Sequence, residues 1–182
     1  DGFDGFYDEN ALRTILVKVT DPANGYNITY STTGEEGSYT EKKPSFKEVG
    51  DYTVYYRVEA GDNYETAEGS TIVKIAGATF AEGDITATGY QGTYDGASHK
   101  ISVETKGSAN GAKVTYSKTG EDGTYTKEVP KFTNATNGVQ TVYYKVSKKG
   151  YTDKVGTVDV SIDRKPVKAA VAVEDKEYDG TK

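Results

Sequence analysis

The sequence predicts an all-β chain: two tandem β-sandwich modules, followed by the first strand of a third. One unit of roughly 87 residues occurs twice, as the offsets between its matching segments show. Within each unit, apolar and polar residues alternate with the period of two that is typical of half-buried strands. Glycines recur between the alternating segments, where turns need them, and no segment has a convincing helical period. Short strands at this spacing are typical of β-sandwiches.

Three pairs of segments define the repeat. The first pair is YSTTGEEGSYTEKKPSF from Tyr30 and YSKTGEDGTYTKEVPKF from Tyr116, which lie 86 residues apart. The second is TVYYRV from Thr53 and TVYYKV from Thr141, 88 residues apart. The third is YETAEGSTIVKI from Tyr64 and YTDKVGTVDVSI from Tyr151, 87 residues apart. The small differences in offset indicate short loop insertions rather than different folds.

A Tyr-Asp-Gly motif sets the expected module boundaries. It stands at Tyr94-Asp95-Gly96 and returns at Tyr178-Asp179-Gly180, while the first unit has Tyr7-Asp8-Glu9. We therefore expect modules at residues 1–78 and 79–165, and the start of a third at 166–182. Only six residues precede Tyr7, so the first strand of the first module should be short or missing. We also expect the sequence to be cut from a longer array. The motif itself is expected to form a turn, or alternatively to contact the preceding module.

The TVYY segments predict the core-facing residues most clearly. We expect Val142, Tyr144 and Val146 to be buried, because they share one face of an alternating strand. Tyr143 should then point away from the core. The equivalent buried residues of the first module are Val54, Tyr56 and Val58, with Tyr55 on the outer face.

Composition excludes several classes of function. The net charge is −6 and the pI about 4.9, which argues against nucleic acid and anionic membranes as partners, since both attract basic surfaces. No apolar run approaches the roughly 18 residues of a membrane span. The absence of cysteine excludes disulfides, thiolate nucleophiles and zinc–cysteine sites.

The order of these motifs resembles the bacterial immunoglobulin-like repeats of the YDG/MBG kind, which occur in tandem in large surface or secreted proteins. The resemblance covers essentially the whole chain, and residues 81–165 carry it best. It implies an extracellular immunoglobulin-like sandwich that serves as a spacer, stalk or adhesive module, without catalytic residues or a cofactor. Gly50-Asp51-Tyr52 also resembles the tyrosine corner of immunoglobulin domains, in which a tyrosine hydroxyl bonds to nearby backbone. The second module has Gln140 in place of Tyr52.

Few residues are candidates for chemistry. His99 is the only histidine, so it could be a general base or a metal ligand, or simply a polar residue facing solvent at a strand edge. Its counterpart is Arg13, which could do neither job. Acidic residues gather at the start of the chain and at the two hairpin tips: Asp1, Asp4, Asp8 and Glu9; Glu35 and Glu36; Glu121 and Asp122. None has calcium-loop spacing, so we expect no metal site.

Tyr55 and Tyr143 are the candidate ligand-binding residues. On the outer face of a flat sheet their rings could stack on sugars, or they could pair across strands and shield the backbone. We therefore expect a non-enzymatic spacer or stalk module of a bacterial cell-surface or secreted protein. The alternative is an adhesive module that binds glycan or a host protein through this tyrosine-bearing face.

Neighbouring repeats of the same chain are the expected partners. The tail, about residues 168–177, has the pattern of a first strand without the rest of its module. Such a strand could pair with a neighbouring copy of the chain, for instance against the first module, by strand donation. It could also pair within its own chain or extend into solvent.

Overall fold

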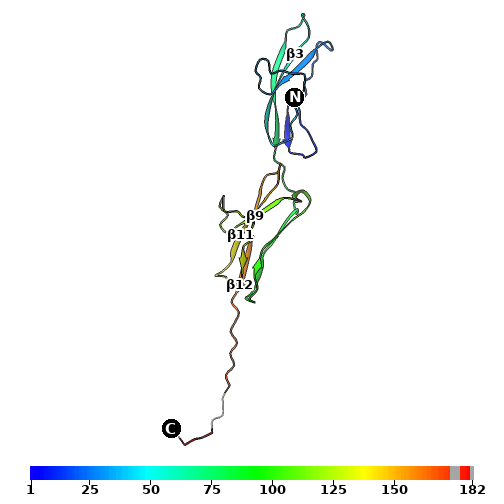
Figure 1. Cartoon of the computed structure of the whole chain (residues 1–182). Helices are drawn as coiled ribbons and strands as arrows, with labels where there is room; N and C mark the ends of the chain where they lie inside the picture. The colour runs from blue at the N-terminus through cyan, green and yellow to red at the C-terminus, as the bar shows by residue number, and fades with distance from the viewer. Residues whose placement is uncertain (173–176, 181–182) are drawn as a thin grey trace. The chain divides into compact units, whose positions relative to one another are not determined.

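The computed structural model describes residues 1–172 and 177–180, and over these residues the chain is all-β (Figure 1). The only helical turn in the described part is η1(Gly107–Ala109), a single 3-10 turn. Residues 164–172 carry no strand. The strand expected for a third module lies partly outside the described residues, because it includes Val173.

The first repeat is built on a four-stranded sheet with the order β1-β4-β3-β2. Its strands are β1(Phe3–Phe6), β2(Asn27–Ser31), β3(Gly50–Glu59) and β4(Ala67–Ala76). β3 pairs antiparallel with both β2 and β4, whereas β1 pairs parallel with β4. β1 is four residues long.

The second repeat has the same topology, with a sheet of order β6-β12-β11-β9. β6(Tyr90–Thr93) again pairs parallel with the closing strand, β12(Lys154–Asp163), and the inner strands are β11(Gln140–Ser147) and β9(Lys113–Ser117) (Figure 1). Two further two-stranded sheets are β7(His99–Lys100) with β10(Lys131–Phe132), and β5(Ile85–Thr88) with β8(Ser102–Thr105). The predicted pair of tandem immunoglobulin-like sandwich modules is therefore confirmed.

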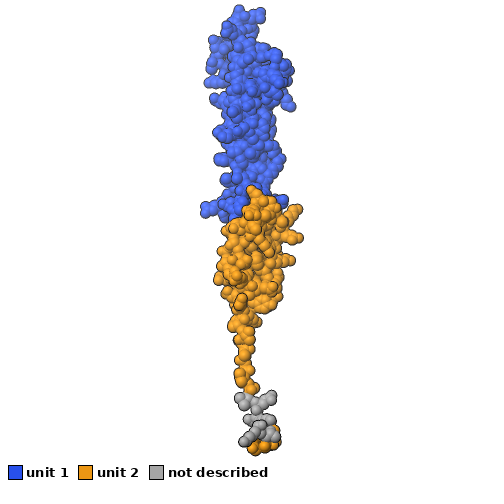
Figure 2. All heavy atoms as spheres, turned by 90° about the vertical axis from the view of Figure 1, so that its left-hand side faces the viewer, with its two compact units in different colours: residues 1–86, 103–114, 145–156 blue, residues 87–102, 115–144, 157–182 orange. Residues whose placement is uncertain are grey.

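The chain forms two compact units (Figure 2). Unit 1 contains residues 1–86, 103–114 and 145–156, and unit 2 contains residues 87–102, 115–144 and 157–182. Each unit thus draws on segments that lie far apart in the sequence. The contacts discussed below lie within one unit or the other.

Equivalent residues form the core of the two repeats. Six hydrophobic positions are buried in both: Ile15 and Ile101, Tyr30 and Tyr116, Val54 and Val142, Val58 and Val146, Val73 and Val160, Ile75 and Ile162. Burying one valine or isoleucine side chain stabilises the fold by about 1.5–3 kcal/mol. The burial predicted for the four valines of the TVYY segments is confirmed.

The predicted burial was wrong for the inner tyrosines of the same strands. Tyr56 and Tyr144 are half-buried rather than buried, and Tyr55 and Tyr143 on the outer face are half-buried as well. The ring of Tyr55 lies against a glycine of the neighbouring hairpin turn, and Tyr143 does the same in the second repeat. Alternation along a strand predicts which face a side chain occupies, but not what covers it.

The tyrosine corner is present in the first repeat, as expected. The Tyr52 hydroxyl donates a hydrogen bond to the backbone carbonyl of Glu48 at 3.1 Å. The Tyr52 ring also stacks on Phe46, with 4.2 Å between the ring centroids. In the second repeat Gln140 takes a similar role, since its side-chain amide lies 3.4 Å from the carbonyl oxygen of Asn137.

The two repeats differ at one edge. In the second repeat β8 pairs with β5. The corresponding stretch of the first repeat, which we call the edge segment (residues 13–20), alternates strictly between inward and outward residues but forms no strand. It makes one isolated bridge, between Arg13 and Phe46.

Candidate functional site

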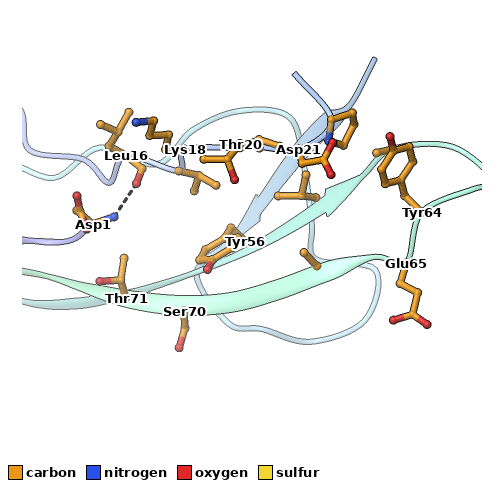
Figure 3. Close-up of a pocket in the computed structure, with 16 residues that line it drawn as sticks. Asp1, Leu16, Lys18, Thr20, Asp21, Tyr56, Tyr64, Glu65, Ser70 and Thr71 are labelled. Carbon is orange, nitrogen blue, oxygen red and sulfur yellow. Dashed lines mark hydrogen bonds between the residues drawn. The ribbon is translucent and has the colours of Figure 1, made fainter. Parts of the chain in front are cut away.

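A cleft of about 580 Å³ lies beside the edge segment in unit 1 (Figure 3). Figure 3 shows the side with Leu16, Lys18 and Thr20 facing the β4 side with Ser70 and Thr71. Tyr56 lies between these two sides, and Tyr64, Asp21 and Glu65 line the cleft farther along. We call this the edge cleft.

Asp1 occupies one end of the edge cleft. Its N-terminal amine donates to the Leu16 carbonyl at 2.7 Å, and the Leu16 N–H donates to the Asp1 carbonyl at 3.0 Å. Two residues that exchange both backbone hydrogen bonds form one rung of an antiparallel ladder. Lys18 would form the next such rung, but its backbone N–H and C=O have no backbone partner among the described residues.

Within the described residues, the edge cleft is lined by no buried polar side chain that lacks a hydrogen-bond partner. In the described part of the chain, the only buried side-chain nitrogen or oxygen without a hydrogen-bond partner is Nε of Arg13, which does not line the cleft. The cleft offers instead an unpaired backbone edge beside mixed polar and apolar walls.

Tyr55 and Tyr143, the predicted ligand-binding residues, contact the turns of their own repeats. A Cβ atom placed on Gly34 would lie 2.9 Å from the Tyr55 ring, and one placed on Gly120 would lie 2.7 Å from the Tyr143 ring. Both glycines have positive φ, of 75° and 78°. Each ring therefore packs on a turn position that only glycine fits. The sequence signal for this contact is the glycine that recurs at the same position of both repeats.

A buried serine organises each of these turns. Ser31 Oγ accepts hydrogen bonds from the backbone N–H groups of Thr33 and Gly34 at 3.0 and 2.9 Å, and lies 2.6 Å from Ser38 Oγ. In the second repeat Ser117 makes the equivalent three contacts at 3.0, 2.9 and 2.6 Å, to Thr119, Gly120 and Thr124. Because both serines are buried, these contacts replace the water that a free hydroxyl would need.

His99 does not face solvent, in contrast to the expectation of a polar residue that faces solvent at a strand edge. Its side chain is 14% exposed, stacks on Tyr90 with 3.6 Å between centroids, and has Nε2 3.0 Å from Oδ1 of Asp95. Hydrogen bonds from His99 and from the Ala97 N–H lower the pKa of Asp95.

The first repeat has an equivalent arrangement, in which Arg13 lies 4.5 Å from the Phe3 ring centroid and 3.8 Å from Asp8. Since arginine cannot act as a base, the shared arrangement is a packing device rather than a catalytic one.

Two residues of the acidic clusters, Asp8 and Glu36, form ion pairs with arginines. Among residues 1–172 and 177–180, no group of three or more histidine, cysteine or acidic side chains is arranged to hold a metal ion. Glu36, at the first hairpin tip, lies 3.0 Å from the guanidinium of Arg57, which also contacts Glu68 at 2.6 Å. The Arg57 hydrogen bond lowers the pKa of Glu36.

An aromatic cluster within unit 1 brings Tyr7 against a turn at Gly150 and Tyr151. The Tyr7 ring lies against Gly150, and its centroid is 6.4 Å from that of Tyr151 in an edge-to-face arrangement. Tyr151 also stacks on Phe80 at 5.0 Å. Tyr7 of the first repeat thus contacts a turn that follows it in the sequence.

Backbone hydrogen bonds and an ion pair reinforce this contact. The Ala78 N–H donates to the Gly150 carbonyl, and the Thr152 N–H donates to the Ala78 carbonyl, both at 2.9 Å. Lys149 Nζ lies 2.7 Å from a carboxylate oxygen of Glu48. We call this set of contacts the joint, and it comprises Tyr7, Glu48, Ala78, Phe80 and residues 149–152.

No helix in the described residues is long and apolar enough to cross a membrane. No family model matches the chain, and no curated protein matches it. Among solved structures, extracellular domains 3–5 of Drosophila OTK are 9% identical with a TM-score of 0.31, over 89% of this chain and 63% of that one. Titin A168–A169 is 12% identical with a TM-score of 0.34, over 88% of this chain and 94% of that one.

A Bacteroides ovatus protein, SGBP-B, solved with a mixed-linkage heptasaccharide, is 12% identical with a TM-score of 0.31, over 88% of this chain and 43% of that one. All these scores are low, so the likenesses carry no argument about what the chain binds. The assignment as tandem immunoglobulin-like repeats rests on the two sheets of equal topology within the chain.

Proposed function

We propose that the chain is a non-catalytic spacer or stalk segment of a bacterial cell-surface or secreted protein. In this proposal, modules at residues 1–78 and 79–165, and a third beginning at 166–182, repeat one sandwich along the chain. The joint is the observation that carries the proposal. A spacer needs connections that resist bending, and the joint combines ring packing, two backbone hydrogen bonds and an ion pair around a short connection.

The recurring devices support the same proposal. The tyrosine–glycine contacts and the serine-centred turns occupy equivalent positions in both repeats. A binding site would need only one copy, whereas a structural device is required in every module.

The joint can be tested through the exchange of two amide hydrogens, those of Ala78 and Thr152. Aromatic pairs contribute about 0.5–1.5 kcal/mol beyond area burial, so Tyr151→Ala should speed this exchange by about two- to tenfold. The matched control is Tyr64→Ala, the equivalent tyrosine of the first repeat, which is 47% exposed. Unchanged exchange in Tyr151→Ala would contradict a stiff joint.

The alternative is an adhesive module that binds glycan or a host protein through Tyr55 and Tyr143. Each ring has one face on a turn glycine and remains half-exposed on the other side. Binding on a glycan array that Tyr143→Ala abolishes and Tyr143→Phe preserves, with both variants folded, would favour this alternative over the spacer.

A further inference from the structure

A second cleft, of about 700 Å³, lies in unit 2 and is lined by residues of β7, β9, β10 and the segment before β10. Three exposed lysines line it: Lys100, Lys118 and Lys131. Among the described residues that line it, Glu128 supplies the one carboxylate. The chain as a whole is acidic, with a net charge of −6, so this cleft has the opposite charge to the average surface. We call it the lysine cleft.

Two of the lysines lie side by side. Lys100 and Lys131 are directly opposite each other in the antiparallel pair of β7 and β10. Directly opposite residues share one face, with Cβ atoms about 4.5–5.5 Å apart, and like charges at such positions are destabilising. Within residues 1–172 and 177–180, no carboxylate forms an ion pair with either amine. Two adjacent positive charges without a counter-charge favour an anion that binds between them.

The third lysine is held in place by an aromatic ring. The Lys118 amine lies 5.6 Å from the ring centroid of Phe132, within the range of a cation–π contact. Because Phe132 is a half-buried residue of β10, this contact keeps the amine beside that strand. Lys118 makes no ion pair within the described residues either. Each of the three ammonium groups therefore has N–H donors for a ligand.

The first repeat does not carry this set of lysines. At the offset of 86, the equivalent residues are Thr14, Thr32 and Ser45. The Thr14 hydroxyl donates a hydrogen bond to the backbone carbonyl of Pro44 at 2.6 Å, so a neutral side chain serves the fold at this position. The sandwich itself therefore does not require lysines here, in contrast to the glycines and serines that recur in both repeats.

The lysines of the first repeat occupy other positions. Lys42 and Lys43 stand in the segment before Pro44, and the Lys43 amine lies 5.9 Å from the ring centroid of Tyr30. The equivalent of Lys43 in the second repeat is Val129, which is shorter and uncharged. Tyr116, the equivalent of Tyr30, forms part of the wall of the lysine cleft.

We propose that the lysine cleft binds an acidic saccharide, with one sugar carboxylate between Lys100 and Lys131 and another at Lys118. The volume of the cleft lies within the range of about 300–1,000 Å³ that is typical of ligand sites. This binding goes beyond the proposed spacer role and does not depend on it, because every residue involved belongs to unit 2.

The other lining residues favour a sugar over a simple polyanion. The Glu128 carboxylate can accept hydrogen bonds from sugar hydroxyls but repels a further anionic group, and the Thr126 hydroxyl can donate or accept. Half-buried Val129 and Pro130 offer apolar surface to the C–H face of a sugar ring. A ligand that fits all these groups carries acidic groups, hydroxyls and an apolar face together.

Isothermal titration calorimetry of the full chain with an oligogalacturonide at low ionic strength tests the proposal. The wild type should bind, and more weakly as salt is added. Replacing Lys100, Lys118 and Lys131 together by glutamine should weaken binding by about tenfold, since each exposed ion pair contributes modestly. The matched control replaces three exposed lysines outside the cleft, Lys113, Lys154 and Lys165, and should bind like the wild type. No binding by the wild type, or equal losses in the two variants, would overturn the proposal.

Three further probes decide the class of ligand. Maltohexaose has the hydroxyls without the charge, whereas polyphosphate and poly-glutamate have the charge without the hydroxyls. All three should bind more weakly than the oligogalacturonide. Polyphosphate or poly-glutamate that binds as tightly as the oligogalacturonide would overturn the assignment to an acidic saccharide, as would equally tight binding of maltohexaose.

Stability without ligand provides an independent measurement. Lys131→Gln removes one of two like charges that lie directly opposite, so its urea midpoint should rise above that of the wild type. Lys127→Gln, at a nearby exposed position that does not line the cleft, should change the midpoint less. A lower midpoint for Lys131→Gln would show that this lysine serves the fold and would overturn its assignment to ligand binding.

Discussion

The ring of Tyr143 packs on Gly120, at a turn where a Cβ atom would lie 2.7 Å from the ring. Gly120 also has a φ of 78°, a conformation that costs other residues about 1–2 kcal/mol. Both the contact with the Tyr143 ring and the positive φ therefore require glycine at position 120. The first repeat has the same relationship between Tyr55 and Gly34.

We predict that Gly120→Ala destabilises the chain by more than its backbone strain alone, because the Tyr143 ring must also move. The matched control is Gly123→Ala in the same turn, where φ is 85° and nothing lies within 4 Å of an added Cβ. Urea denaturation of both variants measures the difference in the free energy of unfolding, for which we expect about 1 kcal/mol or more from displaced packing. Equal losses in the two variants would show that the ring contact contributes nothing.

The buried serine of each hairpin gives a second prediction. Ser117→Ala removes the acceptor of two backbone N–H groups, those of Thr119 and Gly120. Leaving such groups unsatisfied costs about 1–3 kcal/mol, so the urea midpoint should fall accordingly. Ser70→Ala, at an exposed position of β4, should change the midpoint little. A Ser117→Ala variant as stable as the wild type would mean that water replaces the hydroxyl.

The sequence predicted which residues form the core better than it predicted how exposed the outer-face side chains are. Val54 and Val142 could be assigned because a period of two places them on the inner face, and both are fully buried. The partial burial of Tyr55 and Tyr143 could not be predicted, because each ring is covered by a glycine more than 20 residues away in the sequence, at a hairpin tip. The side that a strand residue faces is a local property, whereas its exposure depends on distant segments.

The edge cleft could not be predicted from the first module alone. The alternation from Ile15 to Val19 indicates a strand, but whether another segment pairs with it depends on residues that are distant in the sequence. The joint had a weaker sequence signal, since Gly150 and Tyr151 are recognisable as a turn but their contact with Tyr7 is long-range.

A third prediction concerns the shared core. Val142 is 0% exposed, so Val142→Ala should lower the free energy of unfolding by roughly 1–3 kcal/mol through lost contacts and the cavity left behind. Val54→Ala, at the equivalent position, should cost a similar amount. The control is Val155→Ala, at a position 48% exposed, which should cost less than either. Urea unfolding measures all three, and a similar loss in the control would contradict equivalent cores.

The final prediction concerns pH and the contact between Asp95 and His99. A hydrogen bond from His99 and one from the Ala97 N–H lower the pKa of Asp95 below its ordinary value of 3.8. A carboxyl group with a lower pKa in the folded state stabilises the fold above its unfolded pKa, and this contribution is lost as the pH falls through the folded pKa. Asp95→Asn should therefore reduce stability at pH 6 and matter progressively less below about pH 4.

The measurement is the urea midpoint of the wild type and Asp95→Asn at pH 6 and pH 3. His99→Gln provides the matched comparison, because it removes the largest cause of the lowered pKa while leaving the Ala97 hydrogen bond in place. In the His99→Gln background, Asp95→Asn should therefore have a smaller effect at pH 6 than it has in the wild type. A loss in Asp95→Asn that is equal at both pH values would show that Asp95 contributes through packing or turn geometry rather than through its charge.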